Sequence, residues 1–303
     1  MRPAWSVLLL TTLIGAGQGL YLALFAAELA GLGGSTLYVP GAAVSLALLG
    51  AGLAASFFHL GRPERAWRSA AMWRSSWLSR EVIVLPAFMA AVLAWGAAHA
   101  LGEPTRALGV AGAVLALALF VCTGMIYACL PFLQEWRTPL TVVNFTLLGS
   151  ASGLSAAAAL AALLHAPLAR PYVVAALAVG ALAYLGRLAS MVRNTRLRPK
   201  STLATAIGVK HPRIVQIAQG AMGGSFNTRE FFHGRPREVV RAVRWALLAL
   251  VFPVPALVLL SAKLSAPLLG VAFLLQYAGL LAERWYFFAE AKHPQNLYYQ
   301  AIA

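Results

Sequence analysis

The sequence predicts an all-α integral membrane protein, built as a bundle of eight transmembrane helices. Of its 303 residues, 60% are hydrophobic and only 11% are charged, whereas soluble domains carry about 25% charged residues. Apolar runs long enough to cross a bilayer recur along the whole length, which leaves no separate soluble domain. Because these runs lack the alternation of a transmembrane β-barrel, each should be a helix that satisfies its own backbone hydrogen bonds.

The apolar runs place the spans, since about 20 residues cross the hydrocarbon core. The first run is too long for the apolar core of a secretory signal peptide and follows a single basic residue, so we interpret it as a retained span. Stretches rich in Gly and Ala, such as 149–152 and 156–159, favour close helix packing. One membrane domain then covers residues 1–303, with spans at about 5–27, 37–58, 82–100, 107–133, 141–164, 171–190, 245–262 and 267–289.

The distribution of basic residues predicts the orientation. An even number of spans puts both termini on one side of the membrane, which we call side A. Of the 24 Lys and Arg, only Arg106, Arg170 and Lys263 fall on the other side, side B, which leaves 21 on side A. The positive-inside rule therefore makes side A the cytoplasmic side.

Two side A segments are more charged than a simple connection requires. Residues 59–81 contain five Arg, three Trp, two Glu and one His, and residues 191–244 contain eleven Lys and Arg. A loop as long as the second is usually functional or disordered. Its basic residues could dock a partner subunit, lie against anionic lipid or only set the orientation. The candidate docking residues are Arg65, Arg68, Arg74, Arg137, Arg213 and Arg229.

Ionisable side chains inside spans are costly and mark functional sites, and here they gather at the side A ends. Polar groups from several helices at one depth, between apolar walls, are what a small-molecule site needs. A quinone suits such a pocket, because its carbonyls need donors and its redox chemistry moves protons with electrons. His59 and Glu81, at facing helix ends, are the predicted proton-exchanging pair. The other candidate contacts, which could instead only cap or join helices, are Arg62, Arg80, Tyr127, Asn144 and Gln18.

The chain lacks the residue sets that hold the common redox metals. Cys122 and Cys129 are its only cysteines, so it cannot hold an iron–sulfur cluster by itself. Of the six histidines, only His99 and His165 fall at a common depth, at the side B ends, which disfavours a haem held between two histidines. We therefore expect no haem, no iron–sulfur cluster and no other metal site in this chain.

Two other classes of protein remain as alternatives. A secondary transporter would need polar groups or broken helices near the membrane midplane, and Gln18 is the most polar side chain well inside a span. A purely structural tether, with electrons reaching quinone elsewhere, is compatible with the same spans.

The segment FHLGRPERAWRSAAMWRSSWLSRE, Phe58–Glu81, resembles the signature of membrane anchor subunits of the dimethyl sulfoxide reductase type. These anchors, the DmsC family, belong to the wider polysulfide reductase and NrfD-like group. Similar stretches at Met125–Gly149, at Arg196–Gly234 and in the tail ERWYFFAEAKHPQNLYY extend the resemblance over nearly the whole chain. The arginine-rich first segment looks closer to the sulfite dehydrogenase branch than to the branch that reduces dimethyl sulfoxide and other S- or N-oxides.

This resemblance implies an eight-helix anchor in the bacterial cytoplasmic membrane that binds menaquinone or ubiquinone. It also implies two partners, a four-cluster iron–sulfur subunit and a molybdopterin catalytic subunit. In such anchors a His after the second span and a Glu opening the third serve the quinol site, and these positions match His59 and Glu81. The favoured reaction is sulfite oxidation with quinone as acceptor, and the alternative is quinol-dependent reduction of an S- or N-oxide.

Overall fold

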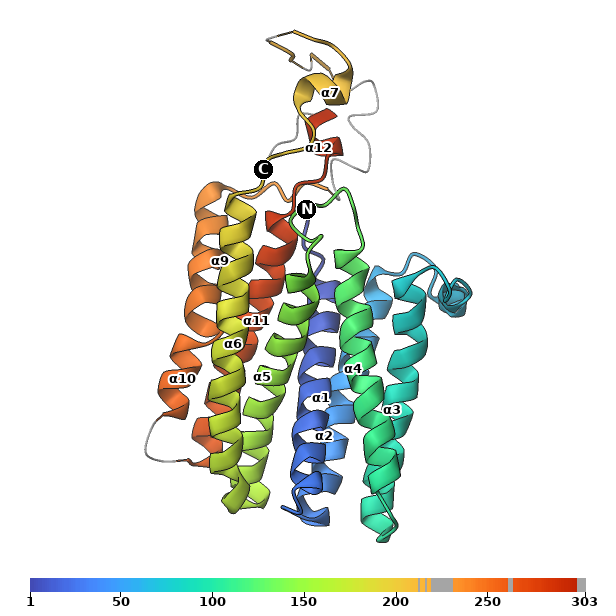
Figure 1. The fold of residues 1–303 in the computed structure, drawn as a ribbon, viewed down its shortest axis with the longest axis vertical. Coiled ribbons are helices and arrows are strands. Elements are labelled where there is room, and N and C mark those ends of the chain that lie inside the picture. The colour runs from blue at the N-terminus through green and yellow to red at the C-terminus, as the bar shows by residue number, and fades with distance from the viewer. Residues whose placement is uncertain (212, 216, 219–230, 261–263, 299–303) are drawn as a thin grey trace.

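The computed structural model describes residues 1–211, 213–215, 217–218, 231–260 and 264–298. Within these ranges the chain forms helices, turns and irregular segments without strands, and eight of its helical segments are long and apolar enough to cross a membrane. Figure 1 shows them side by side in an elongated bundle. The predicted all-α membrane fold is confirmed.

One of the spans is broken along its length. Helices α9 (Arg237–Leu250) and α10 (Pro253–Leu259) meet at Phe252, because Pro253 and Pro255 lack the N–H groups that a continuous helix would need. The other spans are formed by α1 (Trp5–Leu29), α2 (Ser35–Ser56), α3 (Trp77–Leu101), α4 (Arg106–Ala128), α5 (Pro139–Leu164), α6 (Ala169–Thr195) and α11 (Ala266–Glu290). Short helical turns are η1 (Phe57–His59), η2 (Pro63–Ala70), η3 (Ala166–Leu168), α7 (Leu203–Ile207) and α12 (Gln295–Tyr298).

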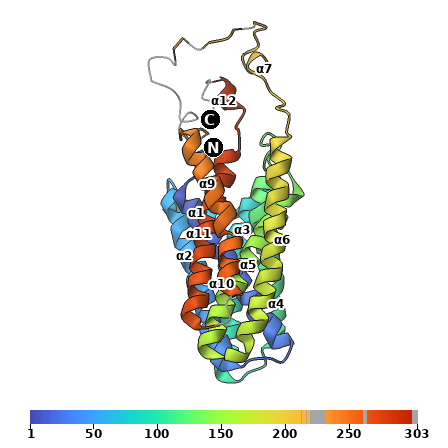
Figure 2. The same cartoon turned by 90° about the vertical axis from the view of Figure 1, so that its left-hand side faces the viewer.

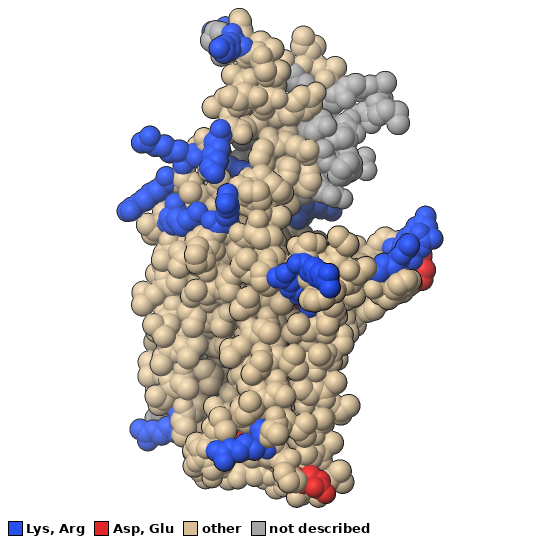
Figure 3. Space-filling model, turned by 45° about the vertical axis from the view of Figure 1, so that its right-hand side comes forward, with Lys and Arg blue, Asp and Glu red and all other residues tan. Residues whose placement is uncertain are grey.

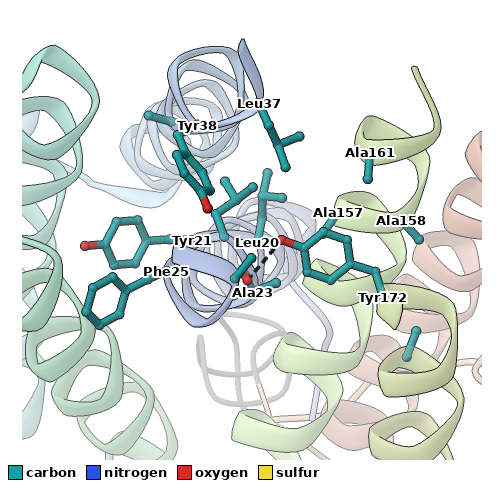
Figure 4. Close-up of a cluster of buried hydrophobic side chains, with 14 of the residues drawn as sticks. Leu20, Tyr21, Ala23, Phe25, Leu37, Tyr38, Ala157, Ala158, Ala161 and Tyr172 are labelled. Atoms are coloured by element: carbon teal, nitrogen blue, oxygen red, sulfur yellow. Dashed lines mark hydrogen bonds between the residues drawn. The ribbon is translucent and has the colours of Figure 1, made fainter. Parts of the chain in front are cut away.

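Helix α1 lies at the centre of the bundle. In its most apolar stretch 72% of the residues are buried, against 28–50% in the other spans. Figure 4 shows the core around it, where Leu20 and Ala23 lie between Tyr38 of α2 and Tyr172 of α6. The Tyr172 hydroxyl donates a hydrogen bond of 3.1 Å to the Ala23 carbonyl. A helix surrounded on all sides by protein can therefore carry polar groups that a lipid-facing helix could not.

Glycines let α1 and α5 approach until their backbones touch. A Cβ atom added at Gly153 would lie 2.1 Å from the carbonyl carbon of Gly19, and one at Gly19 would lie 2.3 Å from the carbonyl oxygen of Gly149. Gly15 and Gly19 face Gly149 and Gly153 at matching four-residue spacings, which is a common packing arrangement of small residues between membrane helices. Contact at this distance fixes the relative rotation of the two helices.

Several helices extend beyond their predicted spans on side A. Helix α3 begins at Trp77 rather than at 82, α6 ends at Thr195 rather than at 190, and α9 begins at Arg237 rather than at 245. The basic connection therefore covers 196–236 and is shorter than the predicted 191–244. Hydropathy marks only the part of a helix that lies in hydrocarbon, whereas polar turns can continue the same helix into the headgroup region.

The connection between α4 and α5 begins earlier than predicted. Helix α4 ends at Ala128, short of the predicted end at 133, and Pro131 follows in an irregular segment. Thr138 then caps α5, and Pro139 occupies the first helical position, where its missing N–H costs nothing. The polar residues 134–137 thus lie in a connection between two spans.

The side A segments gather at one end of the bundle. Helices α7 and α12 stand beyond the spans at the end where the N-terminus lies (Figures 1 and 2). The segment 57–76, between α2 and α3, projects beside the end of α3 (Figure 1). In Figure 3 most of the visible Lys and Arg side chains lie at this end, and fewer lie at the opposite end. The charge asymmetry of the sequence is therefore an asymmetry of the folded molecule.

Candidate functional site

Glu81 is a buried carboxylate in the second turn of α3, and its side chain reaches α4. The Ser76 side chain accepts a hydrogen bond from the Ser79 N–H and so caps the start of α3. Glu81 is 6% exposed, and its Oε1 accepts a hydrogen bond from the Thr123 hydroxyl. Its Oε2 has no hydrogen-bond partner among the residues that the structure describes. One oxygen is thus fixed and the other is free for a ligand or a proton.

Tyr127 presents a free hydroxyl on a rigid ring. It follows Thr123 by four residues, so the two side chains share one face of α4. The ring packs against Trp136, Phe145, Phe287 and Phe288 at centroid distances of 5.2–5.5 Å. Tyr127 is 8% exposed, and its hydroxyl has no hydrogen-bond partner in the described part of the chain.

His59 ends η1, immediately after α2, and its side chain is exposed. Neither a hydrogen bond nor an ion pair joins it to Glu81 or to another described residue. The predicted pair is therefore two separate groups at the side A ends of neighbouring helices, and joint action through a ligand stays a prediction.

The two arginines predicted beside this pair differ in their surroundings. Arg80 donates from Nε to the Trp73 carbonyl at 2.9 Å and from Nη2 to the Arg74 carbonyl at 2.8 Å. Its guanidinium also stacks on the Trp77 ring at 4.2 Å. Arg80 thus ties the projecting segment to α3, whereas Arg62 is exposed. Quinone contact by either residue stays a prediction.

Gln18 joins two helices in the core. It is 1% exposed, and its Nε2 donates to the Ala116 carbonyl of α4 at 2.8 Å. This hydrogen bond gives the buried amide nitrogen a partner well inside the span. A role for Gln18 at a quinone carbonyl stays a prediction.

A buried cluster of charges lies between α6 and α11 on side A. Glu283 forms ion pairs with Arg187, at 3.1 Å, and with Arg284, at 2.7 Å. Arg187 also pairs with Glu290 at 3.5 Å, and the Arg284 guanidinium lies 3.5 Å from the centre of the Phe145 ring. These residues are not among the site residues predicted from the sequence, although charged residues within apolar runs were a signal for them.

Asn144 belongs to this cluster. Its Nδ2 donates to the Ser190 hydroxyl at 2.8 Å, while its Oδ1 has no hydrogen-bond partner within the described chain. The Nε atom of Arg284 also lacks a hydrogen bond there, whereas the Nε atom of Arg187 faces Glu283 Oε1 in the 3.1 Å ion pair. These groups line a cavity of about 10 Å³, which is the size of one water molecule with donors and acceptors around it. A quinone ring does not fit in this cavity, so quinone contact by Asn144 stays a prediction that would need another approach.

The predicted docking residues lie on side A where the structure describes them. Their side chains are exposed at Arg65, Arg68, Arg74, Arg137 and Arg213, and Arg229 lies outside the described residues. The first three alternate with Trp67 and Trp73, which are 74% and 53% exposed. Cations beside large exposed aromatic rings suit a protein interface as well as a lipid headgroup layer.

Metal-ligating residues do not cluster in the part of the chain that the structure describes. No group of three or more His, Cys, Asp or Glu side chains there could hold a metal ion. Cys122 is buried and Cys129 exposed, and both are free thiols.

Comparison with known proteins identifies the family of this chain. The family model of the dimethyl sulfoxide reductase anchor subunit, DmsC, matches residues 1–299. The chain is also 55% identical over 325 residues to a subunit of the sulfite dehydrogenase of Allochromatium vinosum, with 100% of each chain covered. The chain therefore belongs to the DmsC family of membrane anchor subunits.

Proposed function

We propose that this chain is the quinone-reactive membrane anchor of a sulfite dehydrogenase complex, in which electrons from sulfite reach the quinone pool. The choice of reaction rests on the full-length similarity to a subunit of a sulfite dehydrogenase. The observation that carries the site is the buried carboxylate of Glu81, which Thr123 holds by one oxygen, four residues before the free hydroxyl of Tyr127 on the same face of α4.

The donor and acceptor groups of Glu81 and Tyr127 have the chemistry that a quinone headgroup needs. Tyr127 can donate to a carbonyl without breaking a bond within the protein, and the aromatic rings around it exclude water. A bound quinone accepts two electrons and two protons. Glu81 can hold or release a proton at Oε2, since Oε1 is already held by Thr123. His59, exposed on side A, can exchange protons with water.

The metal chemistry belongs to partner subunits in this proposal. A four-cluster iron–sulfur subunit would pass electrons to side A, and a molybdopterin subunit would oxidise sulfite. The exposed arginines of the 57–76 segment, together with Arg137 and Arg213, would dock the iron–sulfur subunit, which then needs a complementary acidic face. Side A would be cytoplasmic, in the inner membrane, with both termini on that side.

The test is the complex purified with Glu81→Gln. We expect sulfite oxidation with a soluble artificial acceptor to continue at the wild-type rate, because that electron path bypasses the quinone. Sulfite oxidation with a quinone acceptor should fall at least a hundredfold, which is within the usual contribution of a general acid or base. Glu64→Gln changes an exposed glutamate of the same segment and is the matched control. Wild-type quinone reduction by the Glu81→Gln complex would remove the site assignment.

A second reaction is favoured by the family description itself. The matching model describes an anchor of dimethyl sulfoxide reductase, so the same site could oxidise a quinol while the partner reduces an S- or N-oxide. The purified complex decides between them. Quinol-dependent reduction of dimethyl sulfoxide, without sulfite oxidation, would keep the anchor and reverse the electron flow.

A further inference from the structure

The Thr123 hydroxyl bonds a carboxylate on another helix, unlike the hydroxyls of several other threonines in the spans. Thr11, Thr12 and Thr146 each donate to the carbonyl four residues earlier in their own helix, which is the usual bond of a helical threonine. The Thr123 hydroxyl instead donates to Glu81 on the neighbouring helix. The hydroxyl proton of Thr123 is therefore directed at a carboxylate of the proposed quinone site.

The surroundings of Thr123 hold this geometry in place. Thr123 and Glu81 are each 6% exposed, so water does not compete for the bond. At the next residue, a Cβ added to Gly124 would lie 2.8 Å from the Cα of Val142. Helix α4 thus packs closely against α5 beside Thr123. This close packing limits rotation of α4 and keeps the Thr123 hydroxyl directed at α3.

We propose that Thr123 is the positioning residue of Glu81, holding its carboxyl group in the orientation that exchanges a proton with the quinone. This inference rests on the proposed function of Glu81. A threonine hydroxyl has one donor and two acceptor lone pairs. It donates to Oε1 strongly when the carboxylate is ionised and more weakly when Oε2 carries the proton, so the contact survives the proton transfer.

Thr123 itself gains and loses no proton in this scheme. During quinone reduction, a proton leaves Glu81 for a quinone oxygen, and two electrons come from the iron–sulfur partner. Glu81 is then reprotonated from side A water, and a second proton reaches the other oxygen by the same supply. Because a hydrogen bond to a charged acceptor is the stronger of the two forms, Thr123 favours the ionised carboxylate.

The experiment compares Thr123→Val, which keeps the shape and removes the hydroxyl, with Thr123→Ser, which keeps the hydroxyl. Thr146→Val is the matched control, since it removes a hydroxyl that bonds only within α5. Each complex is assayed with sulfite and quinone across pH. The full complex is also examined by infrared difference spectroscopy for the carboxylic acid C=O band that Glu81→Gln removes.

We expect Thr123→Val to lower the quinone-linked kcat more than it raises KM. Its pH profile should shift upward by about one unit, a tenfold change in proton affinity, and the Glu81 band should move in frequency. Thr123→Ser should restore the profile and the band, and Thr146→Val should match the wild type. Sulfite oxidation with the soluble acceptor should not change in any of them.

An unchanged profile and band in Thr123→Val would overturn the proposal, provided that Glu81→Gln still abolishes quinone reduction. Wild-type activity of Glu81→Gln would instead refute the proposed function on which it rests. If Thr123→Val does not assemble, Thr123→Ala replaces it. Failure of both to assemble, beside a normal Thr123→Ser complex, would show that the hydroxyl serves folding and would also overturn the positioning role.

Discussion

The ring of Tyr127 and its hydroxyl have separate roles. The ring is packed on several sides by aromatic residues, but the hydroxyl has no partner in the described chain. Replacement by Phe removes only the hydroxyl and so should change the free energy of unfolding by less than about 0.5 kcal/mol. Affinity for a quinone analogue should fall about two- to tenfold, the worth of one hydrogen bond.

Titration of a quinone analogue and thermal unfolding in detergent measure the two effects of Tyr127→Phe. Tyr172→Phe is the contrasting control, because the Tyr172 hydroxyl holds the Ala23 carbonyl between α6 and α1. That variant should lose about 1 kcal/mol of stability and keep its quinone affinity. A loss of stability without a loss of affinity in Tyr127→Phe would contradict the site.

Glu283 shows why a buried charge cannot be removed alone. It is 1% exposed and pairs with Arg187 and Arg284, which are each 3% exposed. Glu283→Gln leaves two buried guanidiniums without their shared counter-charge, and we expect a loss of about 3–5 kcal/mol in unfolding free energy. Glu64→Gln, which breaks an exposed pair with Arg65, should cost no more than about 1 kcal/mol. Equal midpoints of thermal unfolding for the two variants would refute this difference.

At the scale of the helices, the glycine contact between α1 and α5 determines how closely these two helices pack. Gly153→Ala places a methyl group where the Gly19 backbone already lies, and we expect it to cost about 1–3 kcal/mol through overpacking. Gly50→Ala in α2 is the control, since nothing lies within 4 Å of its added Cβ. The control should be neutral or stabilising by up to about 1 kcal/mol. Thermal unfolding of both variants in one detergent makes the comparison, and a stable Gly153→Ala protein would contradict the close approach.

The elements also show what hydropathy can and cannot locate. Apolar runs identified every span, because crossing hydrocarbon demands apolar residues at each turn. They missed the helix ends at Trp77, Thr195 and Arg237, because a helix outside hydrocarbon is held by caps and side-chain contacts rather than by hydropathy. The predicted docking loop was therefore too long at both ends.

At the scale of the whole molecule, side A contains a pH-sensitive region where the N-terminus meets the end of α11. The N-terminal ammonium of Met1 donates to the Phe288 and Ala291 carbonyls at the end of α11. Burial, and then this ammonium, lower the pKa of His293; the pKa of His233 is lowered by burial, the same ammonium and Arg235. Both imidazoles therefore resist protonation in the folded protein.

The sign of the pH dependence follows from these lowered pKa values. Below about pH 6.5 the unfolded chain binds protons at both histidines that the folded chain does not, so stability is lost as the pH falls through the folded values. The thermal midpoint in detergent should thus be lower at pH 5 than at pH 7.5. A double His233→Asn and His293→Asn variant should show a smaller drop. An equal drop in the variant would assign the pH dependence to another group, such as the Met1 amino group, whose pKa burial lowers to about 5.

The sequence by itself determined the membrane class, the number of spans, the charge asymmetry and the family, and it selected Glu81 and Tyr127. These properties are carried by local composition or by a continuous motif, so they survive without knowledge of contacts. Only the tertiary structure decided that Thr123 holds Glu81, that Asn144 lines a cavity of one water molecule, and that Arg187 and Arg284 share Glu283. Such pairings depend on how far each helix rotates and how closely it approaches its neighbour, and in lipid that is set by the packing of small residues rather than by hydropathy.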